Sequence, residues 1–127
     1  MNNELYKKII DNYIKAYNEF DIDGMMLDMH KDVKFENISN GEITLSTNGI
    51  NDLRKQAEQA KQLFKEREQQ IIDITFHNDD AEVAIDYFGI LAVDIPNGPK
   101  AGEKIELKGK SIFRFKDSKI VELKDIS

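Results

Sequence analysis

The stretch NYIKAYNEFDIDGMMLDMHKDVKFEN, residues 12–37, carries three successive patterns that decide the predicted fold. It begins within an apolar stripe of helical spacing, so the first twenty residues are predicted to form an amphipathic helix. The stripe consists of Leu5, Ile9, Tyr13, Ala16 and Phe20, flanked by Tyr6, Ile10 and Tyr17. Asp21 is a suitable N-cap for a second, shorter helix, and the alternation from Val33 to Ile38 is typical of a half-buried strand.

The rest of the chain continues with one more helix and then with strands alone. Asn40-Gly41 marks a turn, and apolar spacing predicts a third helix from about residue 48 to residue 64. Period-two patterns predict strands over residues 70–76, 82–93, 104–115 and 119–126, separated by turn sequences. Helices and one short strand, followed by an antiparallel meander, predict an α+β fold in a single domain over residues 1–127.

Length and composition restrict the classes of function. At 127 residues the chain fits one domain that needs no disulfide or metal for stability. It has no cysteine, which excludes a thiolate nucleophile and any cysteine-based metal site. The formal net charge of −6 disfavours nucleic acid and anionic membranes as partners. The sequence also lacks a Walker loop, a GxGxxG and an HxxxH or HxH pattern, so we expect no metal and no cofactor.

The N-terminal segment predicts a cytoplasmic location. MNNELYKKIIDNY, residues 1–13, has helical spacing of its apolar residues instead of the continuous apolar region of a signal peptide. No stretch approaches the ~18 consecutive apolar residues of a membrane span. We therefore expect a soluble cytoplasmic protein.

The order of elements and two stretches of sequence resemble a known group of proteins. Residues 12–37 resemble the opening of bacterial ketosteroid isomerases and SnoaL-like polyketide cyclases, and GKSIFRFKDSKIVELKDIS, residues 109–127, resembles their closing strand pair. Both families belong to the nuclear transport factor 2-like superfamily. The resemblance implies a cystatin-like cone, in which N-terminal helices pack on a curved antiparallel sheet and enclose an apolar pocket. It also implies frequent dimerisation through the outer face of the sheet.

The isomerase resemblance is incomplete at the residues that perform the reaction. Those enzymes use a tyrosine of the first helix, a general-base aspartate on the first strand and a protonated aspartate on the penultimate strand. Tyr13 matches the tyrosine, but Asn37 and Ser111 occupy the places of the two aspartates. An amide cannot accept a proton at neutral pH, so steroid-type isomerisation is disfavoured. Alternation still turns Asn37 and Ser111 inward, where each is either hydrogen-bonded within the core or in contact with a ligand.

The SnoaL-like resemblance implies a different acid, an aspartate of the last strand that exchanges a proton in an aldol-type ring closure. Asp125 occupies the matching place, and Leu123 shares its strand face and is expected to shield it. Burial there would raise the pKa of Asp125, as a general acid/base requires. The alternative is a solvated carboxylate near the end of the strand.

We predict a catalytic role for Asp125 and Tyr13, with further side chains in contact with the substrate. For the tyrosines the alternative is an ordinary core position with a satisfied hydroxyl group. The predicted substrate contacts are Asn37, Ser111, Tyr87, Tyr17 and Leu123.

These residues leave three functions open. The first is cofactor-free acid/base catalysis of the cyclase or isomerase type on a small, apolar carbonyl compound. The second is a binding protein for a small apolar ligand without catalysis. The third is an interaction module, because Phe88, Ile90 and Ile112 are predicted to form an apolar patch on the convex face of the sheet, suited to a homodimer. The alternative for that patch is cover by the connection from residue 96 to residue 104.

Overall fold

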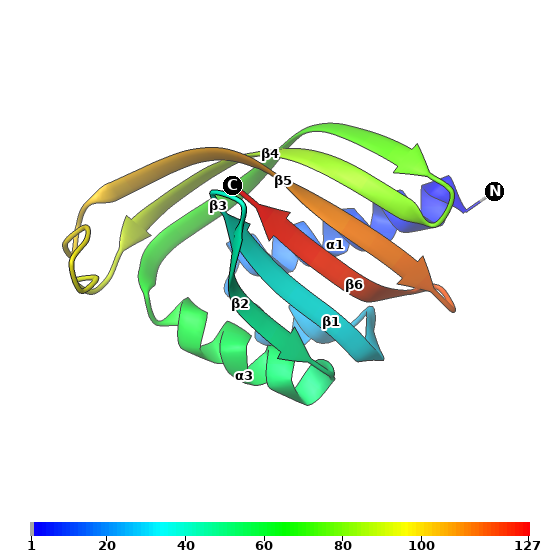
Figure 1. Ribbon diagram of the computed structural model, residues 1–127, viewed down its shortest axis with the longest axis horizontal. Helices are drawn as coiled ribbons and strands as arrows, with labels where there is room; N and C mark the ends of the chain where they lie inside the picture. Colours follow the sequence, from blue (N-terminus) through cyan, green and yellow to red (C-terminus); the bar gives the residue numbers. More distant parts are fainter. Residues whose placement is uncertain (1) are drawn as a thin grey trace.

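One strongly curved, six-stranded sheet forms the frame of the protein in the computed structural model, which describes residues 2–127 (Figure 1). Three helices accompany it in this part of the chain, which confirms the predicted α+β class and the cone of helices on a curved sheet. The elements are α1 (Asn3–Asn18), α2 (Ile22–Met26), β1 (Met29–Ser39), β2 (Glu42–Asn48), α3 (Ile50–Lys61), β3 (Phe64–His77), β4 (Asp80–Leu91), β5 (Lys104–Lys116) and β6 (Lys119–Ile126).

The strand order, β2-β1-β6-β5-β4-β3, places the first and last strands side by side. All neighbours are antiparallel, as predicted for the curved sheet, except β1 and β6, which run parallel. Across it Asn37 lies opposite Asp125, and Ser111 of β5 lies opposite Asp125 on the other side. Three residues from distant parts of the sequence therefore meet on adjacent strands.

Helix α1 forms because its apolar residues recur with helical spacing and turn one face toward the sheet. Near its start the Tyr6 ring stacks on Phe115 of β5, with ring centroids 3.9 Å apart. The helix is rotated slightly from the predicted stripe, since Tyr6 is buried whereas Leu5 is 40% exposed. The predicted cap is confirmed, because the Asp21 side chain accepts a hydrogen bond of 3.0 Å from the Gly24 amide at the start of α2.

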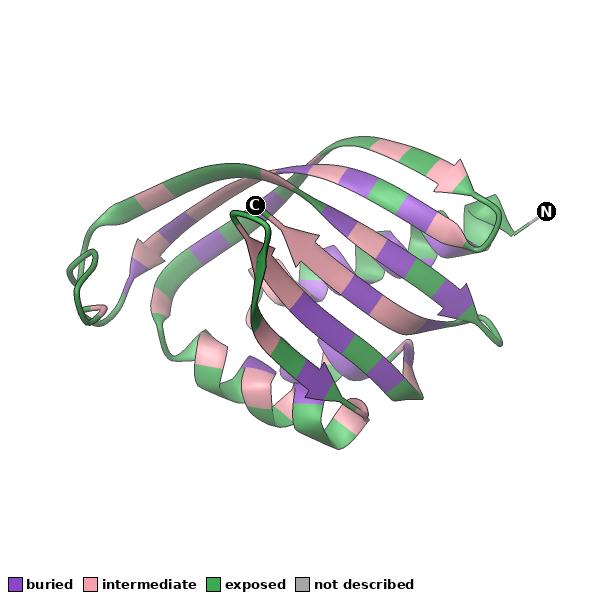
Figure 2. Ribbon diagram, in the orientation of Figure 1, coloured by how far each residue is buried: buried purple, intermediate pink, exposed green. Residues whose placement is uncertain are grey.

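Buried and exposed residues alternate along the strands, as Figure 2 shows. The inward residues form one core with the buried faces of the helices. Val33, Phe113 and Leu123 are fully buried in it. Period-two patterning therefore predicts the core correctly on β1, β5 and β6, where the inward residues are apolar.

Two strands differ from the sequence prediction because polar residues occupy part of their inward faces. Strand β2 was not predicted, and Thr47 is its buried residue. Strand β3 begins at Phe64, six residues before the predicted start, and its first half turns Arg67 and Gln69 inward. Helix α3 correspondingly ends at Lys61, so Phe64 belongs to β3 and not to the helix stripe.

The apolar patch predicted on the convex face is less exposed and less apolar in its surroundings than expected. Phe88, Ile90 and Ile112 are each only half-buried. Charged side chains surround them: the Lys104 ammonium group lies 5.4 Å from the centre of the Phe88 ring, and Ile112 pairs with Glu82 and Lys124 across the sheet. The homodimer through this face stays a prediction.

Of the helices within residues 2–127, none combines the length and apolar character needed to cross a membrane.

Candidate functional site

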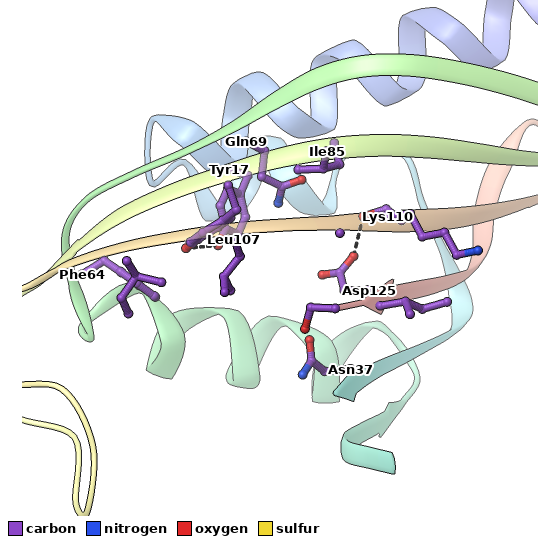
Figure 3. A pocket seen from close by; sticks show the side chains of 14 residues that line it. Tyr17, Asn37, Phe64, Gln69, Ile85, Leu107, Lys110 and Asp125 are labelled. Carbon is purple, nitrogen blue, oxygen red and sulfur yellow. Dashed lines mark hydrogen bonds between the residues drawn. The ribbon is translucent and has the colours of Figure 1, made fainter. Parts of the chain in front are cut away.

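A cavity of about 270 Å³ lies on the concave side of the sheet (Figure 3). Its wall is apolar for the larger part, with a small number of polar groups, which is the usual composition of a small-molecule site. The lining residues come from α1, β1, β3, β4, β5 and β6, and they include five that were predicted from the sequence: Tyr17, Asn37, Tyr87, Ser111 and Asp125.

The cavity exists because β5 loses side-chain volume along its inward face. Phe115 and Phe113 fill the space at one end of the strand, whereas Ser111 and Gly109 follow at the next inward positions. At Gly109 a Cβ atom would lie 2.5 Å from the carbonyl oxygen of Ile126, so only glycine allows the two strands to approach this closely. Small residues on β5 thus leave unfilled volume in an otherwise close-packed interior.

Asp125 is the one aspartate or glutamate among the residues that line this cavity. Part of the residue faces the open volume, but the carboxyl group is enclosed by protein, and this burial raises its pKa to about 6. The Ser111 hydroxyl donates a hydrogen bond of 2.7 Å to Asp125 Oδ1, which acts on the pKa in the opposite direction. With such a pKa the group is mostly ionised at neutral pH but takes up a proton more readily than an ordinary aspartate, so it can both accept and return a proton.

Asn37 reaches the cavity from β1, beside Asp125. Its side-chain amide donates a hydrogen bond of 2.8 Å to Thr44 Oγ1 of β2, and the Thr44 hydroxyl lies 3.3 Å from the backbone carbonyl oxygen of Asn37, to which it donates. These bonds fix the side-chain amide group, so that its Oδ1 and its second N–H are the parts that can address a ligand or water.

Two tyrosines form a second polar group in the same cavity. The hydroxyl oxygens of Tyr17, on α1, and Tyr87, on β4, are 2.9 Å apart. Burial raises the pKa of both phenols, whereas the charge of Arg67 acts to lower it. The Phe64 ring meets Tyr87 edge to face at 6.1 Å and occupies the space over Gly89, where a Cβ atom would approach it to 2.9 Å.

The other two predicted site residues lie in the core beside the cavity and not on its surface. Leu123 is fully buried, and Tyr13 is 7% exposed with its ring edge to face against Phe113 at 5.8 Å. Burial raises the pKa of Tyr13, and the negative charge of Asp125 adds to this effect. Tyr13 is therefore close enough to sense the carboxylate while it packs as a core residue.

Sequence reasoning missed Phe64, Gln69 and Arg67. Gln69 lines the cavity, and its side chain acts to lower the pKa of Tyr17. Arg67 lies behind Tyr17 and is 5% exposed. A periodicity search looks for apolar residues on the inward face, and here that face is polar. Within residues 2–127 no group of three His, Asp or Glu side chains is placed to hold a metal ion.

A curved sheet closed by helices around a cavity with few polar groups defines a small-molecule-binding protein of the cone type. The chain matches the family model of the SnoaL-like domain over residues 10–123. It therefore belongs to the SnoaL-like family. No protein among those with curated descriptions matches it.

Solved structures show the same fold over nearly the whole chain. A candidate polyketide cyclase from Xanthomonas campestris pv. campestris is similar with a TM-score of 0.86 at 17% identity, covering 100% of this chain and 93% of that one. A candidate polyketide cyclase from Pseudomonas putida gives a TM-score of 0.73 at 20% identity, covering 92% and 86%. A protein with a ketosteroid isomerase-like fold from Catenulispora acidiphila, solved in complex with trimethylamine, gives 0.74 at 10% identity, covering 92% and 82%. At these identities the likeness is one of fold.

Proposed function

We propose that the protein is a cofactor-free acid/base enzyme of the cyclase or isomerase type, acting on a small apolar carbonyl compound. The observation that supports this most directly is an aspartate in the cavity whose pKa is raised to about 6. General acid/base catalysis is most effective when the pKa of the group lies near the working pH. Similarity to candidate polyketide cyclases agrees with such chemistry, although it extends only to the fold.

In this proposal the Asp125 carboxylate removes a proton from the carbon next to the substrate carbonyl group. The electrons of the broken C–H bond form the enolate, and Asp125 later returns the proton to carbon or to oxygen. The Ser111 hydroxyl keeps the carboxylate in place through its 2.7 Å bond, and Asn37 orients the substrate or a water molecule. The catalytic role of Tyr13, in which its hydroxyl group would hold the substrate oxygen, remains a prediction from the sequence.

Hydrogen exchange at the α-carbon of a simple ketone tests this role without knowledge of the natural substrate. We expect the protein to accelerate exchange of the α-hydrogens of 2-tetralone in D₂O, followed by proton NMR. Asp125→Asn keeps the size of the side chain and removes its basicity, so the rate should fall by about 10²- to 10⁴-fold. The matched control is Asp117→Asn, in an exposed turn, which should leave the rate unchanged. Equal rates for the wild type and Asp125→Asn would refute catalysis by Asp125.

The second candidate is a non-catalytic binding protein for a small apolar ligand. It is favoured by Asn37 and Ser111, which stand where isomerases carry carboxyl groups and which are both hydrogen-bonded within the protein. Saturable binding of 2-tetralone without any exchange in the same NMR experiment would support this candidate against the first.

Homodimerisation through Phe88, Ile90 and Ile112, and a cytoplasmic location, are part of the proposal. Half-buried apolar side chains on the convex face support the dimer. Light scattering should give twice the mass of the chain, and Ile112→Asp should give the mass of the monomer. A monomeric wild type at high micromolar concentration would refute the dimer.

A further inference from the structure

Arg67 is a buried cation without a carboxylate partner among residues 2–127. The other two arginines form ion pairs at the surface, Arg54 with Asp23 at 2.7 Å and Arg114 with Asp80 at 3.0 Å. Arg67 is only 5% exposed. An unpaired charge in the interior is costly, because hydration is lost and no counter-charge replaces it. Interactions other than an ion pair must therefore compensate for the burial of the Arg67 charge.

The guanidinium group lies between two aromatic rings next to the cavity. Its central carbon is 3.8 Å from the centre of the Tyr17 ring and 4.5 Å from that of Phe20. Its Nε donates a hydrogen bond of 2.8 Å to the backbone carbonyl of Tyr17, which fixes it against α1. One of its terminal nitrogens also lies 3.8 Å from the sulfur of Met25 in α2. Arg67 is thus held directly behind Tyr17, which is part of the cavity wall.

The Tyr17 and Tyr87 hydroxyl groups are on the cavity side of this cation. With their oxygens 2.9 Å apart, one hydroxyl donates to the other, and one O–H remains free for a ligand. A positive charge over the Tyr17 ring stabilises negative charge on its oxygen, which makes the hydroxyl a stronger donor. Hydrogen bonds in such a chain reinforce one another. Figure 3 shows Tyr17 and Asp125 on different sides of the cavity.

We propose that the Tyr17–Tyr87 hydroxyl pair, supported by Arg67, is a binding site for an ionised oxygen of an enolate or phenolate ligand. Arg67 is a positioning residue here, since it acts through Tyr17. The inference rests on the proposed function in one respect: the enolate is the one that Asp125 creates when the C–H electrons move into the C=C bond and the carbonyl electrons move onto oxygen. Binding of a phenolate requires no such step.

Substituted phenols of similar size and different acidity test the site directly. For the wild type at pH 8 we expect 4-nitrophenol to bind as the phenolate, recognised by its visible absorption, and affinity to increase along the series with the acidity of the phenol. Arg67→Met should weaken 4-nitrophenolate binding about tenfold, which is the range of a desolvated cation–aromatic interaction. Arg67→Lys keeps the charge and should retain most of the affinity.

Two further variants separate this proposal from the proposed catalysis. Tyr87→Phe should also weaken phenolate binding, because the hydroxyl chain is broken. Asp125→Asn should strengthen phenolate binding, since a negative charge is removed from the cavity, although the same change should strongly slow the exchange of 2-tetralone. If the wild type does not exchange the hydrogens of 2-tetralone at all, the Asp125 role is refuted, whereas phenolate binding still tests the present proposal.

The proposal is overturned if the wild type binds phenols in the neutral form, or with an affinity independent of their acidity. It is also overturned if Arg67→Met and Arg67→Lys bind 4-nitrophenolate equally well. Should Arg67→Met fail to fold, the wild-type ionisation measurement and Tyr87→Phe still decide the outcome.

Discussion

The two ends of the concave face use the same elements in different ways. At one end α1 presents Tyr6 to Phe115, and the two rings stack at 3.9 Å in a fully packed core. About three turns further along α1, the helix presents Tyr17 to Tyr87, and here the contact is a hydrogen bond beside an open cavity.

The difference between the ends is one of side-chain volume and polarity on β5. Where Phe113 and Phe115 fill the inward face, the interior is closed and apolar; where Ser111 and Gly109 replace them, it is open and contains Asp125. A site of this kind gives up packing contacts that would stabilise the fold. We therefore expect substitutions at the closed end to change stability most, and substitutions at the open end to change ionisation and binding.

The largest effect on stability is expected at the closed end. Phe113→Ala removes a fully buried ring and should lower the free energy of unfolding by about 3–5 kcal/mol. Leu107→Ala, at the open end and 50% exposed, should cost less than about 1 kcal/mol. Urea denaturation of both variants measures the contrast. Equal losses would mean that the two ends are packed alike.

Asp125 should make stability depend on pH in a defined direction. Because its pKa rises from 3.8 to about 6 on folding, the folded state holds the proton more tightly than the unfolded state. The contribution is fully present below pH 3.8 and is lost as pH rises to about 6. At about 1.4 kcal/mol per pKa unit, the wild type should lose about 3 kcal/mol relative to Asp125→Asn over this window.

Urea denaturation from pH 3.5 to pH 7.5 measures this difference, with Asp117→Asn as the exposed control. The control should run parallel to the wild type. Parallel curves for Asp125→Asn as well would mean that the carboxyl group is not buried.

Gly109 should be intolerant of a side chain although it lies beside a cavity. A Cβ atom would lie 2.5 Å from the Ile126 carbonyl oxygen, which is backbone and cannot move without shifting β6. Gly109→Ala should therefore cost about 1–3 kcal/mol in thermal or urea unfolding. Lys108→Ala, one residue away with an exposed side chain, should change stability by less than about 0.5 kcal/mol. An unaffected Gly109→Ala would show that the two strands are not in close contact.

The smallest effect concerns Ser111. Its hydrogen bond to Asp125 lowers the pKa of that carboxyl group, so Ser111→Ala should raise the pKa of Asp125 above about 6. The loss of stability should be near 1 kcal/mol, the usual contribution of one hydrogen bond. Carbon-13 NMR titration measures the shift, and Ser46→Ala on the exposed side of β2 is the control. A lower pKa in Ser111→Ala would contradict the assigned hydrogen bond.

The closed end could be predicted from the sequence, and much of the open end could not. Helical spacing on α1 and alternation on β5 and β6 depend on apolar residues that face the core, such as Ile10, Phe113 and Leu123. On β3 the inward residues beside the cavity are Arg67 and Gln69, which in a pattern search look like solvent-facing residues. The strand was therefore predicted too short.

The strand residues of the site were predicted correctly because their apolar neighbours alternate along the strand, and because the family resemblance marks the same positions. Asn37, Ser111 and Asp125 are inward residues of this kind, and the register places all three on adjacent strands. Tyr13 and Tyr17 share the buried side of α1, but only the tertiary structure distinguishes the one in the core from the one on the cavity wall. Periodicity reports the direction of a side chain and not whether the space in front of it is filled.

The central claim is that the cavity holds an aspartate prepared for proton exchange, and its pKa is the most direct measure. Carbon-13 labelling of aspartate side chains allows Asp125 to be titrated by NMR, with Asp125→Asn identifying its signal. The structure predicts a midpoint of about 6. A midpoint near the ordinary value of 3.8 would show a solvated carboxylate and would contradict the claim.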